Sequence, residues 1–317
     1  MMEEVALEII GNIPKAELHV HLEGSIPLDT LNQLAERKGL PPFLESPYRF
    51  SDFQEFDALF RRLGPYFDKE QDFYEIALAF AKQLTRQGIV YCEATIMPYV
   101  HVARGISFRG LIEAIDAAFT EVEKGHGIRI MLIYAIPRTI GSEAGEKTLD
   151  WMAQNPNPRV VAIDLAGPEL PGTIAPFAPV FERARRMGLK TVAHAGEFLG
   201  PQAIWDTIEL LQPDRIGHGI TAVCDRPLIN HLAEKRVPLD ISITSNVKLK
   251  AVESLKAHPV RRFYDAGIPI TINTDDPAFF QTTLSEEFLH LSRELGFRYD
   301  EIEGLIQNAF IYGFGNK

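Results

Sequence analysis

Eight short runs rich in Val, Ile and Leu recur along the chain, and they constrain its fold more strongly than any other feature of the sequence. In several of them the apolar residues are nearly continuous and polar residues stand only at the carboxyl end, which is typical of parallel strands covered on both faces. The runs are AELHVHL (16–22), IVYCEATI (89–96), RIMLIYAI (129–136), VVAIDLA (160–166), LKTVAHA (189–195), RIGH (215–218), PLDISIT (238–244) and IPITINT (268–274).

Amphipathic stretches lie between these runs and predict helices. They include FYEIALAFAKQLTRQ (73–87), LIEAIDAAFTEVEKG (111–125), APVFERARRMG (178–188) and QAIWDTIELLQ (202–212). Strand and helix patterns alternate at a spacing close to the roughly 30 residues of a βαβ unit. The sequence therefore predicts an α/β fold, a (β/α)8 TIM-type barrel. A doubly wound open sheet is the rival fold, but no GxGxxG motif follows the first strand.

No Ser/Gly-rich linker or abrupt change of composition divides the 317 residues, so we expect a single barrel domain over residues 1–317. The segment 26–71 is rich in Pro, Phe and Leu. It is longer than a simple strand-to-helix connection, and we expect it to form a cap over the mouth of the barrel.

Composition excludes several classes of partner. Lys and Arg total 32 against 43 Asp and Glu, the formal net charge is −11, and no basic block stands out, which argues against binding to a nucleic acid polymer. Cys92 and Cys224 lie too far apart in sequence for a CxxC redox pair or a Cys-rich zinc site. The acidic beginning of the chain and the absence of a long apolar run predict a cytoplasmic protein with no membrane partner.

Chemically reactive side chains gather at the ends of the predicted strands. In a barrel of this type the carboxyl ends of the strands converge on one face, where active sites lie. The residues at these ends are His19, His21, His194, Glu197, His218, Asp275 and Asp276.

The HVH motif of the first strand predicts a metal site at that face. Alternate side chains of a strand share a face, so His19 and His21 point the same way, about 7 Å apart along the backbone. With His194 and Asp275 they would form a nitrogen and oxygen ligand set suited to zinc, with a position left for water. Water bound to such a metal ionises near neutral pH and becomes a nucleophile. Iron, manganese and cobalt accept the same types of ligand.

Each of these residues also has a structural interpretation. A pair of histidines in a strand is more often structural than metal-bound, and Asp275 and Asp276 before Pro277 could cap a helix. His218 could be a packed, hydrogen-bonded histidine, and Glu197 could cap a helix. The combination of three motifs at three strand ends favours the functional interpretation. The remaining histidines fall in loop or helix contexts, where we expect structural roles: His101, His126, His231, His258 and His290.

Six segments occur in an order that is specific to one family. They are PKAELHVHLEGS (14–25), VVAIDLAGPE (160–169), TVAHAGE (191–197), DRIGHG (214–219), TSNVKL (244–249) and ITINTDDPAFF (270–280). With these segments the chain resembles, over nearly its whole length, the adenosine deaminase family of the amidohydrolase superfamily. The resemblance implies that one catalytic zinc ion per chain is held by His19, His21, His194 and Asp275.

The resemblance also implies roles for the other residues. Glu197 would protonate the purine ring at N1, His218 would orient or deprotonate the metal-bound water, and Asp276 would hydrogen-bond N7. Gly167 would present its backbone to the N3 side of the purine. The implied reaction is hydrolytic deamination of a 6-aminopurine to its 6-oxo product plus ammonia. A carboxylic acid near the ring suits this reaction because hydroxide attack at C6 requires the ring nitrogen to gain a proton.

The substrate-specific positions resemble more than one branch of the family. Adenosine-specific relatives usually have HLDG after the metal histidines, with the Asp contacting the ribose 5′-hydroxyl, whereas this chain has HLEG with Glu23 at that place. HLEG, EQDFYE (70–75), MPYVHVARGI (97–106) and SNVKL resemble the adenine deaminase branch. IDLAG and RIGHG resemble the nucleoside branch, although Pro168 replaces an Asp that is common in adenosine enzymes.

We expect an adenosine-type nucleoside as the substrate. Free adenine is one alternative, and 6-aminodeoxyfutalosine of menaquinone biosynthesis, a nucleoside with a bulky 5′ substituent, is another. An amidohydrolase that acts on an amide or lactone would commonly carry a Lys late in the fourth strand, and VVAIDLAG has none. A binding protein without activity would be expected to have lost Glu197, His218 or Asp275, and all three are present.

Overall fold

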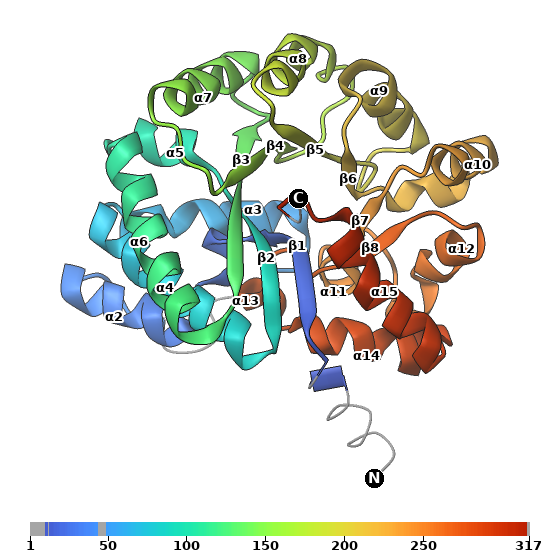
Figure 1. Ribbon diagram of the computed structural model, residues 1–317, viewed down its shortest axis with the longest axis horizontal. Coiled ribbons are helices and arrows are strands. Elements are labelled where there is room, and N and C mark those ends of the chain that lie inside the picture. Colours follow the sequence, from blue (N-terminus) through green and yellow to red (C-terminus); the bar gives the residue numbers. More distant parts are fainter. Residues whose placement is uncertain (1–9, 12, 44–48, 316–317) are drawn as a thin grey trace.

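The eight predicted strands form a single parallel sheet. In a computed structural model that describes residues 10–11, 13–43 and 49–315, each strand pairs with the next in chain order, and a bridge between Val20 and Asp275 joins the last strand region to the first (Figure 1). The strands are β1 (Lys15–His21), β2 (Ile89–Ile96), β3 (Arg129–Pro137), β4 (Val160–Ala166), β5 (Lys190–Ala195), β6 (Arg215–His218), β7 (Leu239–Ile241) and β8 (Ile270–Ile272). The predicted (β/α)8 TIM barrel is confirmed.

Helices surround this sheet (Figure 1). They are α2 (Leu28–Lys38), α3 (Phe53–Arg62), α4 (Glu70–Arg86), α5 (Pro98–Ala103), α6 (Phe108–His126), α7 (Ser142–Gln154), α8 (Ala178–Arg186), α9 (Pro201–Leu211), α10 (Arg226–Lys235), α11 (Ile243–Lys248), α12 (Val260–Asp265), α13 (Pro277–Phe280), α14 (Leu284–Leu295) and α15 (Tyr299–Tyr312). Within the described ranges, no helix has the length and apolar character that crossing a membrane would require.

Helix α6 illustrates how local sequence sets these elements. The Ser107 hydroxyl accepts a hydrogen bond from the backbone N–H of Gly110 and caps the helix, and Gly127 ends it in a left-handed conformation with φ of 65°. Leu111, Ile115 and Ala118 recur at helical spacing and are fully buried. The amphipathic pattern therefore translates directly into packing against the barrel.

The seventh predicted run is shorter as a strand than the sequence indicates. Residues 238–244 all favour extended structure, yet β7 ends at Ile241 and α11 begins at Ile243. The turn into a helix places Ser245 and Asn246 in buried positions, where both side chains make hydrogen bonds at the carboxyl end of the barrel. These tertiary contacts outweigh the local β propensity.

The segment 26–71 contains α2, α3 and a short 3-10 helix at Gly64–Tyr66, while its positions 44–48 lie outside the described residues. The acidic positions 1–9 also lie outside them. Three phenylalanines of α3, Phe53, Phe56 and Phe60, line the same pocket as residues from the strand ends. Helix α3 of this segment therefore lies at the pocket together with the strand ends, and the cap stays a prediction.

Candidate active site

A pocket opens at the carboxyl ends of the strands, and nearly all predicted site residues line it. Its empty space is about 1240 Å³, including solvent at the mouth. The predicted residues on its wall are His21, Glu23, Gly167, His194, Glu197, His218, Asp275 and Asp276. His19 lies directly behind this wall, with its ring centroid 4.6 Å from that of His194.

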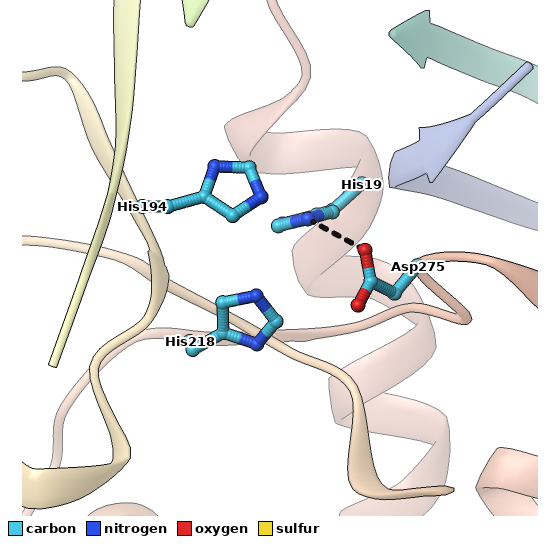
Figure 2. A group of neighbouring side chains, drawn as sticks. All are labelled: His19, His194, His218 and Asp275. Carbon is cyan, nitrogen blue, oxygen red and sulfur yellow. Dashed lines mark ion pairs between the residues drawn. The ribbon is translucent and has the colours of Figure 1, made fainter. Parts of the chain in front are cut away.

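Histidine and aspartate side chains converge at the floor of the pocket. The potential ligand atoms of His19, His194, His218 and Asp275 all lie within 4.8 Å of one another (Figure 2). The Nε2 atoms of His19 and His21 lie 3.4 and 3.2 Å from Asp275 Oδ1. Among the described residues, His19 Nε2 is buried and has no hydrogen-bond partner. A buried nitrogen lone pair beside a carboxylate suits a metal cation.

Neighbouring groups orient two of these side chains. His194 Nδ1 lies 3.0 Å from Asp164 Oδ2, so that it can donate its proton there and leave Nε2 for a metal. Ser245 Oγ donates a 2.7 Å hydrogen bond to Asp275 Oδ2, which leaves Oδ1 facing His19 and His21. Such outer contacts are typical of metal centres in proteins.

The local charge favours a cation. Burial opposes ionisation of Asp164, but the charge and hydrogen bond of His194, together with the charges of His19 and His21, outweigh burial and lower the pKa of Asp164 to about 2. Burial likewise opposes protonation of His21, and Asp276 and Asp275 overcome it and raise the pKa of His21 to about 10. The carboxylates of the cluster therefore bind positive charge strongly.

The surroundings of Glu197 favour the protonated form of its carboxyl group. It is buried, and burial, followed by the charges of Asp275 and Glu169, raises its pKa well above the ordinary value. Glu169 also fixes the loop that carries it, because its carboxylate accepts the backbone N–H groups of residues 196–199 at 2.6–3.1 Å. A neutral carboxylic acid in this pocket can donate a proton.

Two residues at the strand ends adopt the left-handed backbone conformation that is rare for side chains other than glycine. His218 has φ of 64° and Asp275 has φ of 66°. Backbone strain of this kind clusters at functional sites, where surrounding structure must hold it in place. His218 is also fully buried, which lowers the pKa of its imidazole well below the usual value.

The side chain of Asp276 lies so close to position 24 that this position must be glycine. A Cβ atom at Gly24 would lie 1.6 Å from Asp276 Oδ1, far inside van der Waals contact. Among the described residues, Asp276 Oδ1 is buried without a hydrogen-bond partner. The HLEG motif thus has a steric reason for its glycine, and the unpaired Oδ1 atom suits a polar ligand atom.

Several residues outside the predicted set also take part. His101, for which the sequence indicated a structural role, lines the pocket with Nε2 2.7 Å from Glu23 Oε1. His258 is buried and contacts Asn246, which in turn contacts Glu197. By contrast, His126, His231 and His290 are not on the pocket wall that the structure describes. The positions of His101 and Asn246 in the sequence could have indicated their place in the site. The segments 97–106 and 243–248 directly follow strands, and residues that follow strands lie at the active-site face of a barrel.

Comparison with known proteins identifies the family. The family model described as adenosine deaminase matches residues 14–316. An adenine deaminase of Caulobacter vibrioides is 35% identical over 97% of this chain and 91% of its own length. An aminodeoxyfutalosine deaminase of Streptomyces avermitilis is 36% identical over 95% of this chain and 86% of its own.

A solved structure supports the same assignment. The crystal structure of an amidohydrolase from Burkholderia ambifaria with bound zinc superposes with a TM-score of 0.86 at 25% identity, covering 97% of this chain and 87% of that one. Sequence, fold and pocket therefore agree, and the chain belongs to the adenosine deaminase family, a family of aminohydrolases that act on 6-aminopurines.

Proposed function

We propose that the protein is a zinc-dependent deaminase that hydrolyses the 6-amino group of an adenosine-type nucleoside and releases ammonia. The observation that carries this proposal is the carboxyl group of Glu197, which lies buried at the pocket with the histidine and aspartate cluster and whose pKa is raised by that burial. This arrangement provides a proton donor for the purine ring within reach of a metal site.

The residues at the floor of the pocket suit zinc. We propose His19, His21, His194 and Asp275 as its ligands, supported by the unpaired Nε2 of His19 and by the solved relative with bound zinc. When bound, the ion acts as a Lewis acid and lowers the pKa of a coordinated water. Asp164 and Ser245 would then hold two of the ligands in orientation.

The chain's own side chains supply the remaining chemistry. Glu197 gives a proton to N1, which makes C6 more electrophilic. Burial and the charge of Asp275 raise the pKa of Asp276, so its acid form can donate a hydrogen bond to N7, which is an acceptor. Gly167 has φ of 100° and lies on the pocket wall, where its backbone can approach the N3 side.

The lining of the pocket favours a nucleoside over a free base. Phe53, Phe56 and Phe60 of α3, together with Phe198, extend its apolar wall away from the metal cluster. We propose that this outer part accepts the sugar and that segment 26–71 acts as its cap within a single domain.

Two other substrates have specific support. Glu23 favours free adenine. Its Oε1 already accepts hydrogen bonds from His101 Nε2 and the Met97 backbone N–H at 2.7 and 3.1 Å. The same oxygen would be needed to accept a hydrogen bond from a sugar hydroxyl. 6-Aminodeoxyfutalosine is favoured by the phenylalanine-rich wall, which offers aromatic contacts to a large 5′ substituent.

An ammonia-release assay with zinc-loaded protein tests the substrate. Adenine, adenosine, 5′-substituted adenosines and 6-aminodeoxyfutalosine are compared by kcat/KM. We expect a nucleoside to have the highest value. A higher kcat/KM for adenine would replace the nucleoside proposal by adenine deamination, and no ammonia from any of them would overturn the proposed function.

We also propose a cytoplasmic location. Cys92 is buried and Cys224 is exposed, and both are free thiols. A reducing compartment suits unpaired thiols, because disulfides form and persist in oxidising ones.

Replacing Glu23 by Asp should change substrate preference. The shorter side chain moves the carboxylate away from His101 and opens space beside it, so we expect the ratio of kcat/KM for adenosine over adenine to rise about tenfold, the effect typical of one methylene. Glu303→Asp, on the exposed face of α15, is the matched control. An unchanged ratio in Glu23→Asp would remove Glu23 from substrate discrimination.

Replacing Gly24 by Ala should disable the site while leaving the fold intact. The added methyl group must displace Asp276, and misplacement of a substrate-positioning group by about 1 Å can cost about 100-fold in rate. The measurement is kcat/KM, with the far-UV circular dichroism spectrum recorded beside it. Gly304→Ala is the control, because a Cβ there meets open space. Equal activity of both variants would show that Asp276 does not need its present position.

A further inference from the structure

A line of hydrogen bonds runs behind the pocket from α12 to the candidate catalytic residues. The Val260 backbone N–H donates to His258 Nδ1 at 3.2 Å, and His258 Nε2 lies 3.2 Å from Asn246 Oδ1. Asn246 Nδ2 lies 3.1 Å from Glu197 Oε1 and 3.1 Å from His218 Nδ1. All of these side chains are buried, so water does not compete for the contacts.

The direction of the first two bonds follows from elementary chemistry. A backbone N–H can only donate, so His258 Nδ1 must be the bare, accepting nitrogen. A neutral imidazole then carries its proton on Nε2, and burial lowers the pKa of His258 to about 3, which keeps it neutral. Since His258 Nε2–H donates, the atom of Asn246 that faces it must be the carbonyl oxygen.

The orientation of Asn246 decides the protonation of its other neighbours. Its NH₂ group has two hydrogens and faces Glu197 Oε1 and His218 Nδ1. Both atoms therefore act as acceptors, so the neutral ring of His218 carries its proton on Nε2. In Figure 2 this edge of the His218 ring faces His19 and His194. For Glu197, an accepting Oε1 leaves the proton of the acid on Oε2.

We propose that Asn246, oriented by His258, is a positioning residue that holds His218 in its Nε2–H form and Glu197 with its proton on Oε2. The proposal rests on the proposed function and deepens it. His218 then donates a hydrogen bond to the oxygen that adds to C6, and it does not remove a proton from that oxygen. It is also not a metal ligand, although its distances would permit this, because ligation through Nε2 would place a proton on Nδ1 against the N–H of Asn246.

The test measures the tautomer of His218 directly. Zinc-loaded protein with ¹⁵N-labelled histidine is studied by long-range ¹H–¹⁵N correlation NMR, with the His218 signals assigned by their loss in His218→Gln. We expect a bare Nδ1 and a protonated Nε2 in the wild type. A proton on Nδ1 would overturn the proposal without any variant. The spectrum needs no substrate, so its result is independent of the ammonia assay that tests the proposed function.

Variants connect the tautomer to turnover. Asn246→Asp replaces the donor by a carboxylate that can only accept, so we expect His218 Nδ1 to gain a proton and kcat to fall about 100-fold, with KM and zinc content nearly unchanged. His258→Leu should lower kcat, whereas His258→Gln, which keeps an N–H donor, should restore much of it. Asn308→Asp is the matched control, because Asn308 lies in α15 and its Nδ2 donates to the backbone carbonyl of Ile270 in β8.

If Asn246 had a purely structural role, its replacement would lower the stability of the protein without changing which nitrogen of His218 carries the proton. An Asn246→Asp protein that folds and keeps the wild-type tautomer and kcat would overturn the proposal. If this variant does not fold, the wild-type spectrum and the comparison of His258→Gln with His258→Leu decide the question, and equal kcat in those two variants would count against the proposal.

Discussion

Replacing Glu197 by Gln should lower kcat by about 10²- to 10⁴-fold while zinc remains bound, the range expected for loss of a general acid. The glutamine has the shape of the acid and can still face Asn246, but it cannot give a proton to purine N1. The measurements are the kcat of ammonia release and the zinc content of the purified variant. Glu209→Gln, on the exposed face of α9, is the matched control and should keep the wild-type rate.

The pH profile provides a second readout of the same role. Burial and nearby carboxylates raise the pKa of Glu197, so the active acid form persists to higher pH than for an ordinary glutamate and is lost as pH rises through that raised value. Wild-type kcat/KM should therefore fall on the alkaline side, and this limb should be absent in Glu197→Gln. A wild-type rate in the variant would remove Glu197 from the mechanism.

The barrel follows from the sequence because its strands are short, buried on both faces and regularly interrupted by amphipathic helices. β2, β4 and β6 have the predicted bounds, and β1, β3, β5 and β8 differ by one or two residues at one or both ends. The seventh run is the exception, because its carboxyl half enters α11 to bring Ser245 to Asp275. Local propensity could not predict that turn, since the partner lies 30 residues away.

The strand-end residues were predictable for the same reason, because the topology alone brings their side chains to one face. The contacts that control them were not. Glu23 contacts His101, which is 78 residues away in the sequence. Position 24 must be glycine because a side chain there would clash with Asp276, which is distant in the sequence. Sequence patterns record periodicity and local chemistry, whereas the first pair depends on the pairing of β1 with β2 and the second on the closure of the barrel between β1 and β8.

The same closure governs the metal site, since His19 and Asp275 meet only where the ends of the sheet join. His19→Ala should therefore deplete the metal and abolish turnover. Purified wild-type protein should contain about one zinc per chain, as expected for a mononuclear catalytic site. The variant should contain far less, because it loses an imidazole ligand and leaves Asp275 without one of its two histidine neighbours.

Metal content by elemental analysis, kcat and the melting temperature together separate a lost ligand from a lost fold. Zinc that binds the folded protein but not the unfolded chain raises the stability of the folded protein. A chelator should therefore lower the melting temperature of the wild type and have little effect on that of His19→Ala. His231→Ala, on α10 and away from the described pocket wall, should keep its zinc and its activity. Full activity of metal-free wild-type protein would contradict the proposed metal dependence, because turnover would then occur without an ion bound to the His/Asp cluster.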